Sequence, residues 1–319
     1  MRNAWKKITF EITNRCRLRC RICGIWRERP KTDLSVSGIQ KLLTGLDSPA
    51  AVSLTGGEPF LHPEFDVLYK GLYRLFLLKK IRRIDIATNA TSPKLGDFLK
   101  HHPGALTVPL SFSVSLDGLR GVHDAQRGKA GSFDRALKNI LLIKKYGLPL
   151  ALKFVITPLN YGQIEKVRAL AERLGAPLYL KFFEELGSYY HRQKCLSMRL
   201  DAAELKKTGK ILGRLLAREA EKKDNSFAVF SLKALKNYAD RGGLGFIRAC
   251  VSPACSLFVT CQGDIYNCLN QAKIGTLASW PSIDLSLAKK ITRAARFGKC
   301  PGCLSYHGFL KECNLFPLS

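Results

Sequence analysis

Short apolar runs alternate with amphipathic segments along the chain from Ile8 to about Phe183. The runs typical of buried strands are Ile8–Ile12, Ala51–Leu54, Arg83–Ala87, Leu110–Ser115, Leu150–Ile156 and Leu178–Phe182. The segments with helical periodicity between them are Ile39–Leu46, Phe65–Leu77, Lys94–Lys100, Phe133–Tyr146 and Ile164–Leu174. Six β–α alternations predict parallel strands with right-handed crossovers, and they are too few to close an eightfold barrel. We therefore expect an α/β fold, a partial (β/α)6 barrel of the TIM type, with its chemistry at the C-terminal ends of the strands.

The pattern changes after the sixth predicted strand. A helix is expected to begin at Asp201, which forms a capping-box-like pair with Glu204. Farther on, Leu257–Thr260 and Ile265–Asn267 flank Gly263-Asp264 in the manner of a hairpin. We expect a partial barrel, a helical linker and a small cysteine-rich α+β domain over residues 1–185, 186–245 and 246–319.

The chain is strongly basic, with 52 Lys and Arg against 25 Asp and Glu and a formal net charge of +27. Such a field concentrates acidic peptides, phosphorylated metabolites, nucleic acid or anionic lipid, although charge runs are usually solvated helix faces. The N-terminus lacks the apolar core of a signal peptide, and no apolar stretch is long enough to cross a bilayer. These features predict a soluble, cytoplasmic protein.

The chain contains eleven cysteines, an odd number. A reducing cytoplasm disfavours structural disulfides, so clustered cysteines are expected to bind metal or iron–sulfur groups. Three cysteines lie near the N-terminus, seven lie between Cys250 and Cys313, and only Cys195 is isolated.

The N-terminal cysteines Cys16, Cys20 and Cys23 form a CxxxCxxC motif directly after the first predicted strand. Three thiolates on one tight loop can hold three irons of a 4Fe–4S cluster and leave the fourth iron open to a reactant. A zinc site would need a fourth protein ligand, and no histidine lies nearby in sequence. On spacing alone, zinc and plain thiols stay open as alternatives.

A second motif, Thr55-Gly56-Gly57-Glu58-Pro59, follows the second predicted strand. The two glycines allow the backbone to approach a ligand closely, and Glu58 offers an acceptor for an ammonium group. Its place at the end of a strand next to the cysteine motif is what favours a functional interpretation.

With these motifs in order, the chain resembles the radical S-adenosylmethionine (SAM) superfamily from about Ile8 to Phe182. Further matches to that family are Thr88-Asn89, Ser113-Val114-Ser115-Leu116-Asp117-Gly118, His123-Asp124-Ala125-Gln126-Arg127-Gly128 and Gly131-Ser132-Phe133. The last two resemble the HDxxRG…GSF run of the peptide- and protein-modifying branch. One departure is Ile22, where the family often has an aromatic residue beside the adenine; Trp26 follows the motif instead.

The resemblance implies a role for each matching residue. It implies that the 4Fe–4S cluster lies on Cys16, Cys20 and Cys23, and that Arg127 contacts the SAM carboxylate with support from Ser115. The whole SAM-binding set that it implies is Gly56, Gly57, Glu58, Pro59, Asn89, Ser115, Asp117 and Arg127.

The cysteine-rich end resembles the twitch domain, a shortened relative of the SPASM domain that holds one auxiliary 4Fe–4S cluster. By that resemblance the auxiliary ligands are Cys250, Cys268, Cys300 and Cys303. A zinc ribbon built on the CxxC of Cys300 and Cys303 is the alternative. Three cysteines stay unassigned, namely Cys255, Cys261 and Cys313. The isolated Cys195 is either a buried structural thiol or, as in some peptide epimerases of the superfamily, a hydrogen-atom donor.

As the resemblance implies, the chain is an enzyme that reductively cleaves SAM to a 5′-deoxyadenosyl radical, which abstracts a substrate hydrogen atom. We expect it to oxidise, crosslink or epimerise an acidic peptide or protein, with an electron donor such as flavodoxin or ferredoxin. The alternative substrate is a sugar, an aminocyclitol, or a phosphorylated or lipid-linked small molecule.

A non-catalytic, nucleic-acid-associated metal protein is the alternative from another class. It predicts aromatic residues interleaved with the basic ones, but Lys206–Lys223 and Lys289–Lys299 carry none except Phe297. Nucleic acid is therefore not expected as a partner.

Overall fold

A computed structural model describes residues 5–101, 109–183, 198–221, 227–241, 252–268 and 272–296. Six parallel strands form its centre, and each contains one of the predicted apolar runs. They are β1 (Lys7–Thr13), β2 (Ala50–Gly56), β3 (Ile81–Thr88), β4 (Leu110–Ser115), β5 (Leu150–Ile156) and β6 (Leu178–Phe182). The α/β fold with an open, partial barrel is therefore confirmed.

The strands lie in one curved sheet in the order β6-β5-β4-β3-β2-β1-β7-β8-β9. The last three strands come from the cysteine-rich end of the chain: β7 (Ser256–Val259), β8 (Asp264–Tyr266) and β9 (Gly275–Thr276). The β7 strand pairs in parallel with β1, whereas β8 and β9 continue as antiparallel neighbours. The predicted hairpin is thus joined to the barrel sheet, and the division of the chain at residues 185 and 245 stays a prediction.

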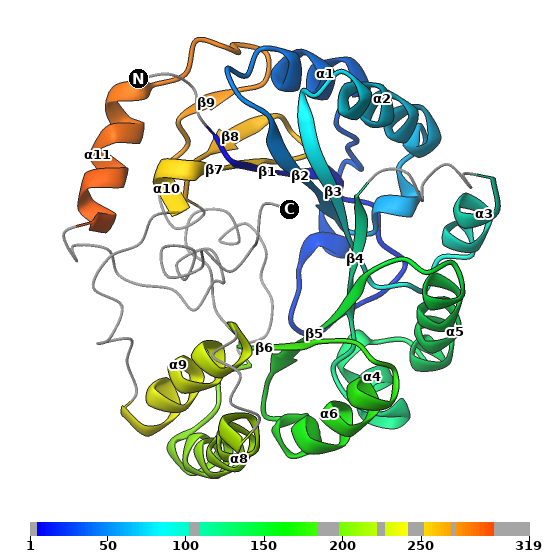
Figure 1. Cartoon of the computed structure of the whole chain (residues 1–319), viewed down its shortest axis with the longest axis vertical. Coiled ribbons are helices and arrows are strands. Elements are labelled where there is room, and N and C mark those ends of the chain that lie inside the picture. The colour runs from blue at the N-terminus through cyan, green and yellow to red at the C-terminus, as the bar shows by residue number, and fades with distance from the viewer. Residues whose placement is uncertain are drawn as a thin grey trace.

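Helices cover the outer face of this sheet (Figure 1). Those described are α1 (Val36–Thr44), α2 (Phe65–Leu77), α3 (Lys94–His101), α4 (Arg120–Arg127), α5 (Ser132–Lys145), α6 (Ile164–Arg173), α8 (Ala202–Glu221), α9 (Phe227–Arg241), α10 (Ser252–Cys255) and α11 (Leu285–Arg296). At the start of α8, the Asp201 N–H donates to Glu204 at 2.9 Å and the Glu204 N–H donates to Asp201 at 2.7 Å. The predicted capping box is therefore present.

The two faces of the sheet differ in polarity. In β1, Ile8, Phe10 and Ile12 are fully buried and belong to the apolar core with the helices. Because side chains alternate along a strand, Thr9 and Glu11 lie on the opposite, concave face. The helices therefore stabilise the fold from outside, and the concave face is left for polar side chains.

Four sequence-predicted site residues lie outside the described residues, namely Cys195, Cys250, Cys300 and Cys303. Within the described ranges, no helix has both the length and the apolar character that a bilayer crossing requires.

Candidate functional site

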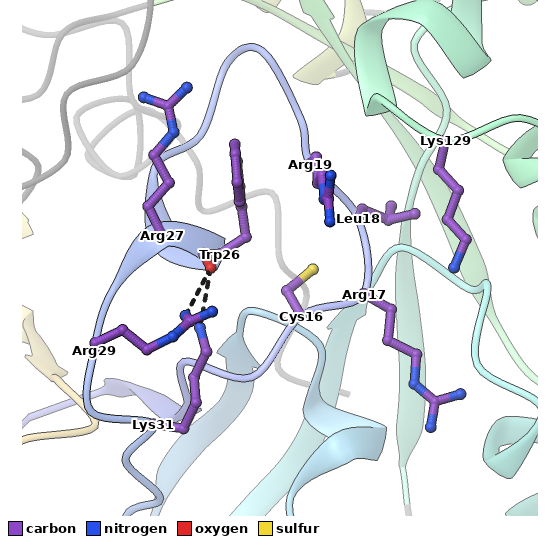
Figure 2. A pocket seen from close by; sticks show the side chains of 9 residues that line it. All are labelled: Cys16, Arg17, Leu18, Arg19, Trp26, Arg27, Arg29, Lys31 and Lys129. Atoms are coloured by element: carbon purple, nitrogen blue, oxygen red, sulfur yellow. Dashed lines mark hydrogen bonds between the residues drawn. The ribbon is translucent and has the colours of Figure 1, made fainter.

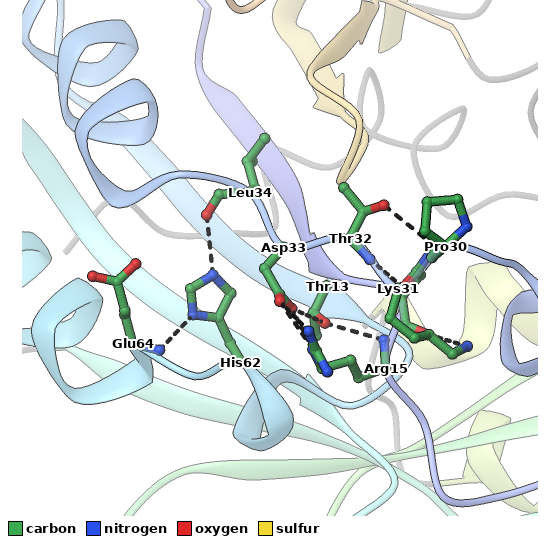
Figure 3. A network of polar contacts seen from close by, with 10 residues as sticks. Thr13, Arg15, Pro30, Lys31, Thr32, Asp33, Leu34, His62 and Glu64 are labelled. Carbon is green, nitrogen blue, oxygen red and sulfur yellow. Dashed lines mark hydrogen bonds and ion pairs between the residues drawn. The ribbon is translucent and has the colours of Figure 1, made fainter.

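Between β1 and α1, residues 14–33 form a loop that carries the three N-terminal cysteines, and we call it the cysteine loop. Polar contacts close its base (Figure 3). The Thr13 hydroxyl donates to Asp33 at 2.6 Å, and Arg15 forms an ion pair with Asp33 at 2.9 Å. The Asn14 amide oxygen accepts from the Thr32 N–H at 2.8 Å. The loop therefore begins and ends at one point, and its cysteines project over the end of the sheet.

The three cysteines share a cavity of about 140 Å³ with the ends of neighbouring strands, and we call it the site cavity. From the cysteine loop its walls include Cys16, Cys20, Cys23 and Trp26. The opposite walls come from the ends of β2, β3 and β4 and from α4: Thr55, Gly56, Gly57, Ala87, Thr88, Asn89, Ser115 and Arg127. The structure therefore brings the three N-terminal cysteines together with five of the eight predicted SAM-binding residues, although they span more than a hundred positions.

The glycines after β2 allow this close approach. The Gly57 N–H donates to the Thr13 carbonyl at 2.8 Å, and the Glu58 N–H donates to the Arg15 carbonyl at 2.8 Å. A Cβ at position 57 would lie 2.3 Å from the Arg15 carbonyl oxygen. Gly56 has a φ of 145°, which few other residues adopt. The backbone of this turn is thus fastened directly to the start of the cysteine loop.

The Glu58 carboxylate faces the protein interior. It is 1% exposed, accepts from the Thr88 hydroxyl at 2.7 Å and from the Asn89 N–H at 2.9 Å, and does not line the site cavity. Burial raises its pKa to about 7, although these hydrogen bonds act in the opposite direction. Glu58 therefore ties the end of β2 to the end of β3, and any contact of this motif with an ammonium group falls to its backbone. Pro59 is buried at the start of a 3-10 helix and likewise lies outside the cavity walls.

Arg127 is the cation of the site cavity. It is 8% exposed and pairs with the fully buried Asp117 at 2.5 Å, and its Nη1 lies 3.9 Å from the Cys20 sulfur. Burial alone would lower its pKa, but Asp117 and Cys20 together raise it above the ordinary value. Asp117 in turn accepts the Val155 N–H at 2.9 Å, so β5 orients the pair. Asp117 is therefore a positioning residue for Arg127.

The donor set fits an iron–sulfur cluster with one open iron better than a closed zinc site. Burial raises the pKa of Cys16 and of Cys23 to about 12, and it also raises the pKa of Cys20. The thiols would therefore need a bound metal to become thiolates. Among the described residues that line the cavity there is no histidine, carboxylate or fourth cysteine. The Nε of Arg127 is buried without a hydrogen-bond partner in the described chain, which suits a further anionic ligand.

Four hydrophobic residues of the loop line the cavity, namely Leu18, Ile22, Ile25 and Trp26. Ile22 and Trp26 both line it, and the Trp26 indole N–H donates to the Cys20 carbonyl at 3.4 Å. Trp26 therefore supplies an aromatic wall that Ile22 does not.

Some supporting residues were missed by sequence reasoning. Asn139 of α5 donates to the carbonyls of Ala90 and Ser92, at 2.7 and 3.2 Å, and so fixes the turn after Asn89. Only a contact between positions far apart in sequence reveals this role.

Of the proposed auxiliary ligands, Cys268 alone lies among the described residues, where it is partly buried against the core.

Comparison with known proteins gives a family and a fold. A sequence model of the radical SAM superfamily matches residues 10–174. The antilisterial bacteriocin subtilosin biosynthesis protein AlbA of Bacillus subtilis is 27% identical over 178 residues, which are 54% of this chain and 38% of AlbA. The AdoMet-dependent heme synthase of Methanosarcina barkeri is 30% identical over 192 residues, 57% of this chain and 52% of the synthase. The chain spans about half the length of these relatives or less.

Solved structures share the fold at low identity. The structure of anSMEcpe with bound AdoMet and the Cp18Cys peptide matches with a TM-score of 0.66 and 16% identity, over 98% of this chain and 87% of that one. SuiB of Streptococcus suis bound to precursor peptide SuiA matches with a TM-score of 0.62 and 17% identity, over 92% and 66%. Both likenesses support the partial-barrel architecture described above.

Proposed function

The chain belongs to the radical SAM superfamily of enzymes, and from this premise we propose that Cys16, Cys20 and Cys23 hold the 4Fe–4S cluster that activates SAM. The observation that carries the proposal is the site cavity, where the three thiols face the strand-end residues and Arg127. Thiolate donors in this number leave one iron without a protein ligand.

When bound, the reduced cluster supplies one electron that splits SAM into methionine and a 5′-deoxyadenosyl radical, and this radical takes a hydrogen atom from the substrate. The chain itself binds and orients the reactants. Arg127, held by Asp117, offers a guanidinium group to the SAM carboxylate. The backbone around Gly56 and Gly57 binds the amino group, and Asn89 and Ser115 line the remaining wall.

A peptide or protein is the substrate that we propose. Support comes from relatives whose names state the biosynthesis of a bacteriocin or the maturation of a product, namely AlbA, the sporulation killing factor maturation protein SkfB and the mycofactocin maturase MftC. The net charge of +27 suits an acidic peptide.

A tetrapyrrole is the second candidate, because three of the relatives are an AdoMet-dependent heme synthase, a pre-heme d1 synthase and an Fe-coproporphyrin III synthase. The test is multiple-turnover SAM cleavage by the anaerobically reconstituted protein with acidic precursor peptides or with iron porphyrins. A peptide that stimulates 5′-deoxyadenosine release, and that loses two hydrogens or gains solvent deuterium by mass spectrometry, supports the first candidate. Stimulation by porphyrins alone contradicts it.

The cysteine-rich end is proposed to hold one auxiliary 4Fe–4S cluster on Cys250, Cys268, Cys300 and Cys303. Support comes from the spacing and from Cys268, which follows β8 in the sheet that also holds β1. Cys268→Ala is expected to lower the iron content of the reconstituted protein and leave SAM cleavage in place. An unchanged iron content contradicts the auxiliary cluster.

A further inference from the structure

A second and larger hollow adjoins the cysteine loop, and we call it the basic hollow. It has a volume of about 610 Å³ and is lined by Cys16, Arg17, Leu18, Arg19, Trp26, Arg27, Arg29, Lys31 and Lys129. Six of these nine residues are cationic, and none is acidic. Figure 2 shows the basic side chains arranged around the Cys16 thiol. Such a wall attracts anions and repels cations.

The basic hollow reaches the cysteine loop from a different side than the site cavity. The two share Cys16, Leu18 and Trp26, but the basic hollow touches none of the residues that end β2, β3 and β4. Those strand ends, with Arg127, form the wall to which we assign SAM. A substrate seated in the basic hollow would therefore lie apart from the wall to which we assign SAM, whereas a partner there lies directly against Cys16, one of the three proposed cluster ligands.

Trp26 connects the basic hollow with a proposed cluster ligand. Its ring lines both spaces, and its indole N–H donates to the Cys20 carbonyl at 3.4 Å. The Arg27 guanidinium lies 4.7 Å above the ring centre, and that of Arg19 lies at 6.0 Å. These cation–π contacts hold the aromatic ring between the charged rim and the peptide of Cys20.

The positive charge of the basic hollow is held in place by backbone carbonyls. Lys31 donates to the carbonyls of Asn14 and Trp26, both at 3.2 Å, and Arg29 donates to the carbonyl of Trp26 at 3.1 Å. Burial and then the neighbouring Arg29 lower the pKa of Lys31. Glu28 is an acidic neighbour in the loop, but it does not line the basic hollow.

We propose that the basic hollow is the docking site of an acidic one-electron carrier protein that reduces the cluster. In this step the carrier loses one electron and the oxidised cluster gains it, and no atom or proton is exchanged. The inference rests on the proposed cleavage of SAM. Beyond that proposal, it names the surface next to Cys16 and Trp26 that the carrier recognises through complementary charge.

Binding tests the docking surface without any turnover. The probe is oxidised flavodoxin, titrated against the reconstituted protein. The test variant is the double substitution Arg29→Gln with Lys129→Gln, which removes two exposed charges from the rim of the basic hollow. The matched control is Lys206→Gln with Lys207→Gln, which removes two exposed charges from α8.

At about 0.05 M salt, the test variant is expected to bind flavodoxin about tenfold more weakly than the wild type, and the control about equally well. At about 0.5 M salt the difference should shrink, because the Debye length falls below the separation of the charges. Equal affinity of the test variant and the control overturns the proposal.

The source of the electron provides the second test. With reduced flavodoxin, the Arg29→Gln/Lys129→Gln protein should cleave SAM about tenfold more slowly at low salt, whereas with saturating dithionite it should match the wild type. Equal slowing with both reductants would place the basic hollow in SAM or substrate binding and overturn the docking proposal alone. A wild-type protein that cleaves SAM with neither reductant overturns the proposed function, and the docking proposal with it.

Discussion

Gly57→Ala tests the contact between the GGEP turn and the cysteine loop. A Cβ at this position would lie 2.3 Å from the Arg15 carbonyl oxygen and 2.9 Å from the Cys16 Cβ. An ordinary carbon–oxygen contact is roughly 3.3 Å, so the turn and the loop must separate by about 1 Å. The separation breaks the 2.8 Å hydrogen bond from the Glu58 N–H to Arg15. With overpacking, the loss of stability should be about 2–4 kcal/mol.

The larger effect is expected on the site. A displacement of about 1 Å at reacting groups costs roughly 100-fold in rate, so SAM cleavage should fall by about that factor. Iron bound after anaerobic reconstitution and the midpoint of urea unfolding are the measurements. Gly121→Ala is the matched control, because that glycine lies in α4 with no atom within 4 Å of the added Cβ. If Gly57→Ala bound iron and cleaved SAM as well as the control, the close approach would not matter and the reasoning would fail.

Three further predictions concern buried polar groups. Asp117→Asn leaves Arg127 buried without its charged partner. It should lower the free energy of unfolding, measured with urea, by about 3 kcal/mol, and it should weaken SAM binding, measured by equilibrium dialysis. Unchanged SAM affinity would exclude the positioning role. Burial raises the pKa of Glu11 from 4.5 to about 7. The part of the free energy of unfolding that depends on protonated Glu11 is therefore fully present below pH 4.5 and is lost as the pH rises to about 7. Glu11→Gln keeps an acceptor for the Cys261 N–H. Its free energy of unfolding should therefore equal that of the wild type near pH 4.5 and exceed it by on the order of 3 kcal/mol at pH 8. Unfolding free energies that vary in parallel with pH in the two proteins would contradict this. Cys20→Ser should lose the SAM-site iron while the apo protein keeps the circular dichroism of the wild type; full iron would exclude Cys20 as a ligand.

The strands could be predicted from sequence because each is a short apolar run beside a clear helical segment. Ile8–Ile12, for example, lies inside β1, and Leu150–Ile156 coincides with β5. The grouping of the motifs followed from the same pattern, since the C-terminal ends of parallel strands meet at one edge of a sheet.

Side-chain direction was beyond the sequence. Spacing places Glu58 at the end of β2, but only the structure shows that its carboxylate turns inward to Thr88 and Asn89. The basic hollow was missed because a run of charges is usually a solvated face, and only the structure shows that Arg17 and Arg29 of the cysteine loop line one hollow with Lys129. Contacts between residues far apart in sequence leave no local pattern.

The most direct test of the account is whether the anaerobically reconstituted protein forms 5′-deoxyadenosine from SAM and a strong reductant. We expect formation by the wild type and none by Cys20→Ala, whose cluster loses a ligand. The assignment of the site would be contradicted if the wild type bound its full iron and SAM but formed no 5′-deoxyadenosine, even with peptide or porphyrin present. It would also be contradicted if Cys20→Ala still formed 5′-deoxyadenosine.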